Sequence, residues 1–491
     1  MIPILDNINE LSSKTAVIEK NNNYSYSQLS IDINAYSNYF YKHNQTYIAT
    51  LLKGSYNYTK TLLGIWKSDN IAVPLSSSYP IIDLDYFIKD SNAQFLIFDD
   101  ENSTIAKELK SLNQHITFLH VDEIKPTKTF HPKKIDINNE ALVIYTSGTT
   151  NKPKGVVHSH AALDFQFKTL SQAWHWSKED VIPVFLPLHH IHGIVNKLCC
   201  SIFNNATIDI YNGFKIESIY NNISKGTYTI FMAVPTIYKK LITYHQKQDQ
   251  LNKQSFETAC KQIRLMISGS AALPVSILKE WEEISGHRLL ERYGMSEIGM
   301  AISNPYHGER KPGHIGQAFN GIEVKLMNDD GHEIKTDNNP GEIYIKGPNL
   351  FKTYLNKAEA YHSSFKDGWF MTGDIAALNN GYYKIVGRKS VDIIKSGGYK
   401  ISALEIEEVA RQYKDVSDCA VVGIEDEEWG EIIGIWVESM IEDEDDFKSY
   451  LKQNLPNHKL PRIYQLEGKN IPRNSIGKVL KKEVIKSIIK P

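Results

Sequence analysis

A short apolar run that leads into a glycine-containing polar loop constrains this chain more than any other segment. Residues 141–145 are Ala-Leu-Val-Ile-Tyr, and residues 146–155 are Thr-Ser-Gly-Thr-Thr-Asn-Lys-Pro-Lys-Gly. Glycine lets a backbone approach an anion, hydroxyl groups donate hydrogen bonds to phosphate oxygens, and Lys154 adds a mobile cation. The segment therefore predicts a strand followed by a phosphate-binding loop, although a simple polar turn uses the same residue types. It lacks the Gly-Lys-Ser/Thr ending of a Walker P-loop, which argues against an ordinary P-loop kinase or ATPase.

Apolar runs and helical stretches alternate along the first 300 residues. Runs at 47–52 and 94–98 flank a helical stretch at 56–66, which predicts an α/β fold with substantially parallel strands. A further strand-like run at 231–234 precedes a helix expected near 235–236, and another at 264–267 ends in the polar segment 268–271. Ligands of open α/β sheets gather where strand ends meet loops, so these loops predict one shared cleft.

The pattern changes after about residue 313 to short strands with frequent turns. Strand-like segments occur at 341–346 and 382–386, and Asn-Gly at 380–381 is a hairpin signal. These features predict a β-rich subdomain.

The last hundred residues read as a small α+β unit. Residues 402–405, Ser-Ala-Leu-Glu, form a capping box that begins an amphipathic helix. Strand-like runs follow at 419–423 and 432–437, and a helix is expected near 445–455. The whole pattern predicts a large N-terminal body of α/β subdomains with a β-rich subdomain (residues 1–387) and a small mobile C-terminal lid (residues 388–491).

Composition excludes several other classes of protein. A chain of 491 residues is too long for one compact core. Its formal net charge of -2 gives no electrostatic reason to expect nucleic acid or an anionic membrane as a partner. The apolar run at 181–188 is far shorter than the ~20 residues that span a bilayer, and reads as a buried strand. Four cysteines, two of them adjacent (Cys199 and Cys200), and no signal peptide favour a reducing, cytoplasmic location without an evident protein partner.

Residues 145–155 resemble the phosphate-binding signature of the ANL superfamily, which comprises acyl-CoA synthetases, peptide-synthetase adenylation domains and luciferases. Further segments as far as Lys478 resemble other motifs of this family in the same order, so the resemblance covers essentially the whole chain. It implies an enzyme that uses ATP and Mg²⁺ to convert a carboxylic acid into an acyl-adenylate. It further implies transfer of the acyl group to coenzyme A.

The resemblance also assigns residues to the nucleotide. Tyr293 would stack on adenine, Ser296 would touch the α-phosphate and Glu297 would help to hold Mg²⁺, which prefers oxygen ligands. Asp374 would bind both ribose hydroxyls. Without the other motifs, Glu297 would be interpreted as a solvated side chain and Asp374 as a turn or helix-capping residue. The implied ATP- and AMP-binding residues are Thr146, Ser147, Gly148, Thr149, Thr150, Lys154, Ser270, Ala271, Glu291, Tyr293, Gly294, Met295, Asp374 and Arg388.

Two segments of the lid resemble sites for the two half-reactions. Lys478 would enter the active site during adenylation, where a cation stabilises anionic attacking and leaving groups. A lysine near a basic C-terminus is otherwise usually a surface charge. Residues 395–400 resemble a loop that lines the pantetheine tunnel, reached by rotation at a hinge among residues 389–392. The implied catalytic residues are Lys478, Glu297, Ser296 and His190, and the implied CoA-binding residues are Ser396, Gly397, Gly398 and Tyr399.

The identity of the acid depends chiefly on Arg292, a cation beside the adenine motif that could pair with a second carboxylate on the substrate. A structural salt bridge, for example to Glu291, is the alternative. Residues 187–193 contain three histidines, whose spacing to the cysteines matches no familiar zinc site. The implied substrate-binding residues are Arg292, His190, His192 and Ser268.

These segments resemble the malonyl-CoA synthetase group and predict activation of malonate or methylmalonate. Two alternatives stay open. One is a ligase for medium- or long-chain fatty acids or aromatic acids, and the other is an adenylating enzyme that loads a separate carrier protein.

Overall fold

The N-terminal part of the computed structural model is built on a mostly parallel sheet with the strand order β19-β8-β7-β4-β3-β5-β6. The structure describes residues 2–6, 8, 13–126, 131, 133–146, 152–474 and 477–489. Strands β3 to β7 of this sheet pair in parallel, as the sequence predicts, and β8 returns antiparallel to β7. Its strands are β3 (Tyr47–Leu51), β4 (Ile71–Pro74), β5 (Phe95–Phe98), β6 (Thr117–His120), β7 (Glu140–Thr146), β8 (Lys154–Ser159) and β19 (Thr353–Tyr354).

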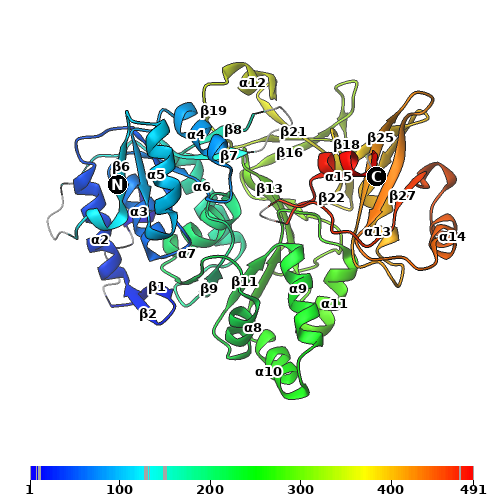
Figure 1. The fold of residues 1–491 in the computed structure, drawn as a ribbon, viewed down its shortest axis with the longest axis horizontal. Helices are drawn as coiled ribbons and strands as arrows, with labels where there is room; N and C mark the ends of the chain where they lie inside the picture. The colour runs from blue at the N-terminus through cyan, green and yellow to red at the C-terminus, as the bar shows by residue number, and fades with distance from the viewer. Residues whose placement is uncertain are drawn as a thin grey trace.

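Helices accompany this sheet in the blue and cyan part of Figure 1. Serine side chains cap α2, α3 and α6, and at the start of α3 the Ser55 side chain accepts a hydrogen bond from the Tyr58 amide. The helical elements are α1 (Pro3–Asp6), α2 (Tyr26–Tyr39), α3 (Tyr56–Lys67), α4 (Ile81–Asp90), α5 (Ser103–Leu112), α6 (His160–Ala173), and the short turns η2 (Asp100–Asn102) and η3 (Val121–Glu123).

A second sheet has the order β2-β1-β10-β9, with bounds β1 (Thr15–Glu19), β2 (Asn22–Ser25), β9 (Val181–Val184) and β10 (Thr207–Ile210). The prediction of one strand over residues 181–188 is therefore too long. Strand β9 ends at Val184 because its partner β10 ends opposite it at Ile210. The chain then passes through a loop into a π-helical segment, η4 (His192–Cys199), and the short helix α7 (Cys200–Phe203).

A third sheet, with the order β11-β12-β13-β14-β15, extends into the green lobe at the bottom of Figure 1. Strands β11, β12 and β13 are parallel, so the segments that follow β11 and β12 emerge at one edge. Its strands are β11 (Ile230–Ala233), β12 (Leu265–Ser268), β13 (Leu290–Met295), β14 (Gly299–Ser303) and β15 (Gln317–Ala318). The lobe's helices are α8 (Ile216–Ser224), α9 (Pro235–Gln246), α10 (Gln250–Cys260) and α11 (Val275–Ser285).

An antiparallel sheet with the order β17-β16-β18-β21-β20, and with β22 paired to β21, forms the expected β-rich subdomain. Asn380 and Gly381 join β21 to β22 with φ angles of 48° and 79°, the left-handed conformations of a tight hairpin turn. The elements are β16 (Glu323–Met327), β17 (Glu333–Ile334), β18 (Pro340–Lys346), α12 (Ala358–Ser363), β20 (Phe365–Lys366), β21 (Trp369–Asn379) and β22 (Tyr382–Arg388).

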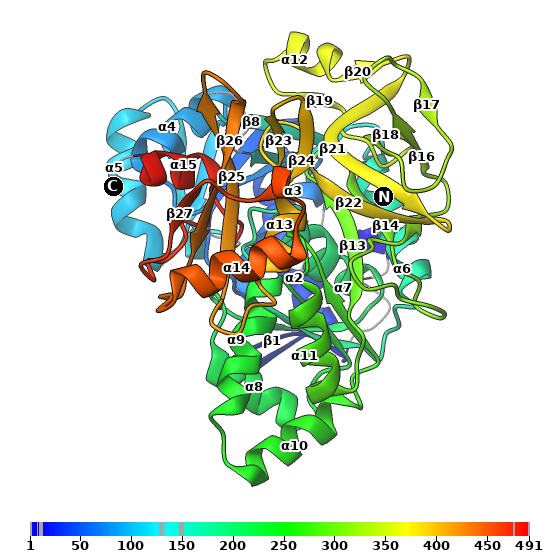
Figure 2. The same cartoon turned by 90° about the vertical axis from the view of Figure 1, so that its right-hand side faces the viewer.

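The C-terminal lid is the orange and red α+β unit in Figure 2. It has a hydrophobic core of its own, which includes Ile406, Val421 and Phe447. Ser402 caps α13 by accepting the Glu405 amide at 3.3 Å, as the capping box predicts. The boundary between residues 387 and 388 stays a prediction. The elements are β23 (Ile393–Ser396), β24 (Tyr399–Ser402), α13 (Ala403–Ala410), β25 (Cys419–Asp426), β26 (Gly430–Val437), α14 (Glu444–Asn454), η5 (Asn457–Lys459), β27 (Ile463–Gln465) and α15 (Lys481–Ile489).

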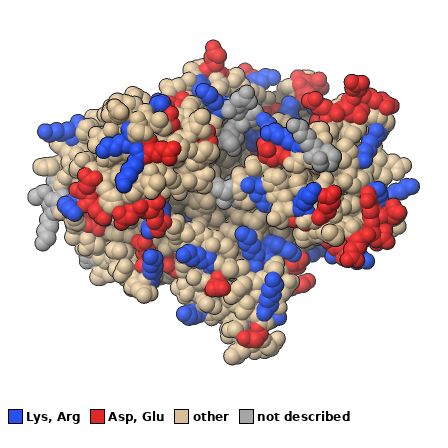
Figure 3. Space-filling view, in the orientation of Figure 1, with Lys and Arg blue, Asp and Glu red and all other residues tan. Residues whose placement is uncertain are grey.

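The surface in Figure 3 is hollowed between the body and the lid. Basic and acidic side chains intermingle over most of this face, and acidic side chains gather at the right edge. Among the described residues, none of the helices is both long and apolar enough to cross a bilayer. The fold thus places polar strand ends and the lid around one hollow.

Candidate active site

Asp374 lies at the centre of the first group of polar side chains. The Tyr293 hydroxyl donates to Asp374 Oδ2 at 2.6 Å, and Arg388 Nη1 lies 3.4 Å from Oδ1. Strand pairing places Asp374 directly opposite Arg388. Burial raises the pKa of Asp374, and the charge of Arg388 opposes this rise. The result is a positioned carboxylate that can accept two hydrogen bonds from a vicinal diol.

Glu297 forms a second group on the loop between β13 and β14. The Tyr354 hydroxyl donates to Glu297 Oε1 at 2.9 Å, and Lys154 Nζ lies 4.8 Å from the Tyr354 ring centroid. Glu297 is 8% exposed, and burial raises its pKa. A buried carboxylate of this kind is stabilised as an anion by a nearby cation, and its oxygens are the donors that Mg²⁺ prefers. The donor chemistry therefore fits a magnesium ion.

The backbone around Ser296 is fixed by a residue that sequence reasoning missed. His158 on β8 lies with Nε2 2.8 Å from the Ser296 carbonyl oxygen. Burial lowers the pKa of His158 to about 4, so the ring is neutral and its Nε2–H donates to that carbonyl. Gln166 likewise bonds both the amide and the carbonyl of Met300. Two side chains from distant segments thus position the loop that carries Glu297.

Arg292 lies buried beside Gly269 in the third group. A Cβ at Gly269 would lie 2.5 Å from Arg292 Cζ, so only glycine leaves room for the guanidinium. Arg292 Nη2 lies 3.4 Å from Ser270 Oγ, which is 3.0 Å from His192 Nδ1. Arg292 is 4% exposed, and burial lowers its pKa to about 9.

The Arg292 cation has no carboxylate to pair with among the described residues, and its Nε has no hydrogen-bond partner there. The suggested salt bridge to Glu291 is wrong, because Glu291 Oε1 accepts the Gly313 amide instead. Adjacent residues of a strand point to opposite faces. Burial raises the pKa of Glu291 to about 8.

The histidine loop contributes further unsatisfied polar atoms. His189 and His192 are buried, and the Nε2 atoms of both rings lack a hydrogen-bond partner within the described part of the chain, as does Ser268 Oγ. Burial lowers the pKa of His190 to about 4 and holds the pKa values of His189 and His192 well below the ordinary value of a histidine. Buried polar groups are rarely left unpaired, so these neutral donors and acceptors are available to a ligand.

Other predicted nucleotide residues occupy the turns around these groups. Thr146 and Lys154 face each other across the β7–β8 hairpin. Gly294 lies where a Cβ would come 2.0 Å from the Gly299 carbonyl oxygen, and Met295 pairs with Gly299. Ser270 has a φ of 70° in the turn that leads through Ala271 towards α11. The predicted residues Ser147, Gly148, Thr149 and Thr150 lie outside the described residues.

The lid brings Lys478 to the body. A Cβ at Gly477 would lie 2.6 Å from Thr236 Oγ1, so this turn packs on the start of α9. Burial raises the pKa of Asp374, and the charge of Lys478, like that of Arg388, opposes this rise. The structure therefore brings together Lys478 and the predicted nucleotide carboxylate, which lie about a hundred residues apart in the sequence.

The predicted CoA loop is a tight hairpin on the lid. Ser396 pairs with Tyr399, and Gly397 and Gly398 have φ angles of 54° and 81°. Tyr399 is exposed and stacks on His458 of the lid, 4.6 Å between centroids. Its described contacts are with the lid, so this structure does not bring it to Asp374 or Glu297.

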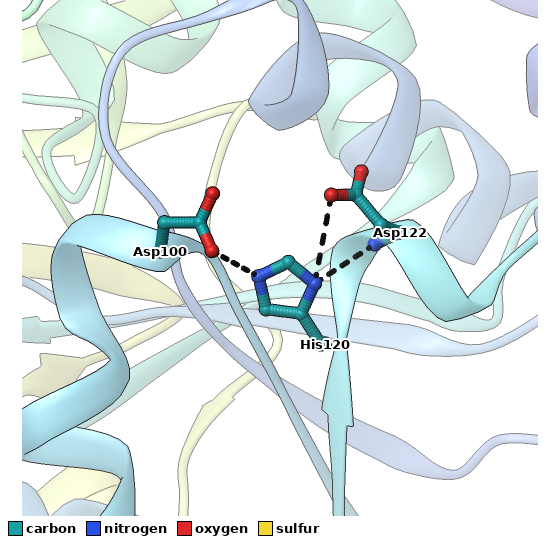
Figure 4. A group of neighbouring side chains, drawn as sticks. All are labelled: Asp100, His120 and Asp122. Carbon is teal, nitrogen blue, oxygen red and sulfur yellow. Dashed lines mark hydrogen bonds and ion pairs between the residues drawn. The ribbon is translucent and has the colours of Figure 1, made fainter.

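One group of side chains among the described residues has the spacing of metal ligands: Asp100, His120 and Asp122 (Figure 4). His120 Nε2 lies 3.1 Å from an Asp100 oxygen, and His120 Nδ1 accepts the Asp122 amide at 3.3 Å. The Nδ1 contact belongs to the capping of η3, in which Glu123 also accepts the His120 amide. The Nε2 contact with Asp100 joins η2 to this cap.

Comparison with known proteins agrees with this arrangement. Residues 6–355 match the AMP-binding enzyme family, and residues 405–478 match the AMP-binding enzyme C-terminal domain. The mitochondrial malonate–CoA ligase of Xenopus laevis is 35% identical over 531 residues, covering 99% of this chain and 92% of that protein. The malonate–CoA ligase of Arabidopsis thaliana is 36% identical over 477 residues, covering 90% and 78%. The crystal structure of ATP-bound MatB from Rhodopseudomonas palustris has a TM-score of 0.91 and 27% identity, covering 100% of this chain and 99% of that one.

The fold and the grouped carboxylates and lysines define an adenylate-forming ligase, and the chain belongs to the AMP-binding enzyme family. It is an AMP-forming acyl-CoA ligase. The predicted fold class and superfamily are confirmed.

Proposed function

We propose that this enzyme activates malonate or methylmalonate, forming the acyl-CoA thioester, AMP and pyrophosphate from the diacid, ATP and CoA. The observation that carries the choice of acid is Arg292, a buried guanidinium packed over Gly269 without a carboxylate partner among the described residues. The names of the Xenopus and Arabidopsis relatives support it.

A second carboxylate on the substrate would pair with the buried positive charge of Arg292. A buried guanidinium is costly unless it is paired, and a planar guanidinium can bind a carboxylate through two parallel hydrogen bonds. The neutral His192 ring and Ser268 Oγ offer further hydrogen bonds to a polar acid. A long apolar acyl chain would leave all these groups unpaired.

The assigned residues account for both half-reactions. In the first, a substrate carboxylate oxygen attacks the α-phosphorus of ATP and pyrophosphate leaves. Lys478 and Lys154 would stabilise the negative charge that develops on the phosphates, and Asp374 would hold the ribose. Glu297 would hold Mg²⁺, which supplies charge neutralisation at the phosphates. In the second, the CoA thiol sulfur attacks the adenylate carbonyl and AMP leaves, with residues 396–399 brought in by rotation of the lid near residues 389–392.

A panel of acids tests the proposed substrate. With ATP and CoA, the enzyme should form malonyl-CoA or methylmalonyl-CoA with a kcat/KM about 10²-fold or more above that for acetate, octanoate or benzoate, because those acids lack the second carboxylate. Thioester formation is followed by mass spectrometry. Preference for octanoate or benzoate would favour the alternative ligase, and failure of free CoA as acceptor would favour a carrier protein.

Gly269→Ala should weaken the acid site selectively. The new Cβ would displace the Arg292 guanidinium, which lies 2.5 Å away, so the KM for malonate should rise by about tenfold or more. The KM for ATP should change by less than about twofold. Equal effects on both substrates would contradict a role for this pair in acid binding. Steady-state kinetics with each substrate varied in turn provide the measurement.

We also propose a cytoplasmic location. The four cysteines are free and buried, a state that reducing compartments maintain. Cell fractionation should recover the enzyme with cytosolic markers, and recovery in an organelle would contradict this location.

A further inference from the structure

A buried ion-pair group lies three residues beyond Lys478, where helix α15 begins. Lys481, the first residue of α15, has Nζ 2.6 Å from Asp392 Oδ1 and 3.0 Å from Glu407 Oε1. The side chains of Lys481, Asp392 and Glu407 are 10%, 15% and 5% exposed. The two carboxylates raise the pKa of Lys481 against burial, so the ammonium is charged.

The two carboxylates belong to different parts of the lid. Asp392 Oδ2 accepts the Arg388 amide at 2.9 Å, which ties it to the end of β22. Glu407 lies on α13, where its Oε1 also accepts the Val421 amide at 2.9 Å. Lys481 therefore joins the C-terminal segment both to the lid core and to the residue that pairs with Asp374.

The tether between Lys481 and Lys478 is short. Three residues span at most about 10 Å, so fixing Lys481 limits where Lys478 can reach. The segment between them is also held, because the Leu480 amide bonds the Pro472 carbonyl and the Lys478 amide bonds Asn474 Oδ1. The position of the Lys478 ammonium thus depends on the anchor at Lys481.

The charge of Lys478 also helps to lower the pKa of Asp392. Lys481 already pairs with the Asp392 carboxylate, so Lys478 does not have to pair with it and can reach the body. Without the Lys481 charge, Asp392 would attract Lys478 away from the phosphate site. Lys481 therefore favours the placement of Lys478 at the phosphate site in two ways: it fixes the C-terminal segment, and it pairs with Asp392 in place of Lys478.

We propose that Lys481 is a positioning residue for the adenylation step, holding Lys478 at the phosphate site through Asp392 and Glu407. This inference rests on the proposed role of Lys478. The thioester-forming step uses another face of the lid and should not need the anchor.

The test measures the two half-reactions of the enzyme separately. Lys481→Gln should slow malonate- and ATP-dependent pyrophosphate release by about tenfold or more, because small displacements of a catalytic group have large effects on rate. Formation of malonyl-CoA from synthetic malonyl-adenylate and CoA should stay within about twofold. Lys481→Arg should recover most of the first step, since it keeps the charge. Lys486→Gln, an exposed position on the same helix, is the matched control and should behave as the parent enzyme.

Each other outcome has a definite meaning. If Lys481→Gln slows both steps alike, the residue is only structural, and if it slows neither, it positions nothing. Either result overturns the proposal. In a Lys478→Ala background, Lys481→Gln should add less than about twofold, because the positioned group is gone. If Lys478→Ala alone leaves pyrophosphate release unchanged, the proposed role of Lys478 has failed, and the inference about Lys481 with it. If Lys478→Ala slows pyrophosphate release but Lys481→Gln does not, the inference about Lys481 is overturned and the proposed role of Lys478 stands.

Discussion

Lys478→Ala should lower the rate of malonyl-adenylate formation by about 10²–10³-fold. The attacking carboxylate and the α-phosphate are both anionic, and removing one preorganised cation from such a site has effects of this size. The structure places Lys478 close enough to Asp374 for its charge to oppose the rise in pKa that burial causes at that carboxyl. Rapid-quench measurement of pyrophosphate release in single turnovers reports this step directly.

The second half-reaction provides the contrast for Lys478→Ala. Conversion of synthetic malonyl-adenylate and CoA into malonyl-CoA should stay within about threefold of the parent enzyme, because no phosphate charge develops there. Lys469→Ala is a suitable control, since Lys469 is an exposed lid lysine that pairs with Glu467. Equal losses in both half-reactions would contradict the assignment of Lys478 to adenylation.

Arg292→Ala should lower kcat/KM for malonate by about 10²–10³-fold. Breaking a buried ion pair costs about 3–5 kcal/mol, and the lower part of this range, about 3–4 kcal/mol, corresponds to a factor of this size. Propionate has the same number of carbon atoms but lacks the second carboxylate. The kcat/KM for propionate should not fall, because the substitution removes a guanidinium that propionate leaves unpaired. Steady-state kinetics with both acids give the ratio.

The control for Arg292→Ala is the variant Arg288→Ala. Arg288 is a partly exposed arginine, close to Arg292 in the sequence, that pairs with Glu282. It should leave the malonate-to-propionate ratio unchanged. Binding of ATP to Arg292→Ala, measured by calorimetry, should also be unchanged. A malonate-to-propionate ratio that survives the loss of Arg292 would show that the second carboxylate is bound elsewhere.

Local patterns were sufficient for most of the fold. Alternating apolar runs predict the parallel strands, Asn380-Gly381 predicts the β21–β22 hairpin, and Ser402 predicts the start of α13, because each signal acts within a few residues. The strand predicted over residues 181–188 ends early, since its length depends on the end of β10, which no local pattern encodes.

Residues of the candidate site could be predicted from the sequence only where they belong to a continuous motif. Glu297, Asp374 and Lys478 each occur in a recognisable segment, whereas Tyr354 and His158 do not. Tyr354 reaches Glu297 because β19 pairs with β8, and His158 reaches Ser296 across 138 residues of sequence. The need for glycine at 269 becomes apparent only when Arg292 lies against it. Such contacts arise from tertiary packing.

Malonate-dependent exchange of labelled pyrophosphate into ATP, measured without CoA, tests adenylation of a small diacid most directly. The reversible first half-reaction predicts rapid exchange with malonate or methylmalonate, and little with acetate, octanoate or benzoate. Exchange should be lost in Lys478→Ala and, with malonate, in Arg292→Ala. Release of ADP and phosphate in place of exchange, or faster exchange with octanoate than with malonate, would contradict the account.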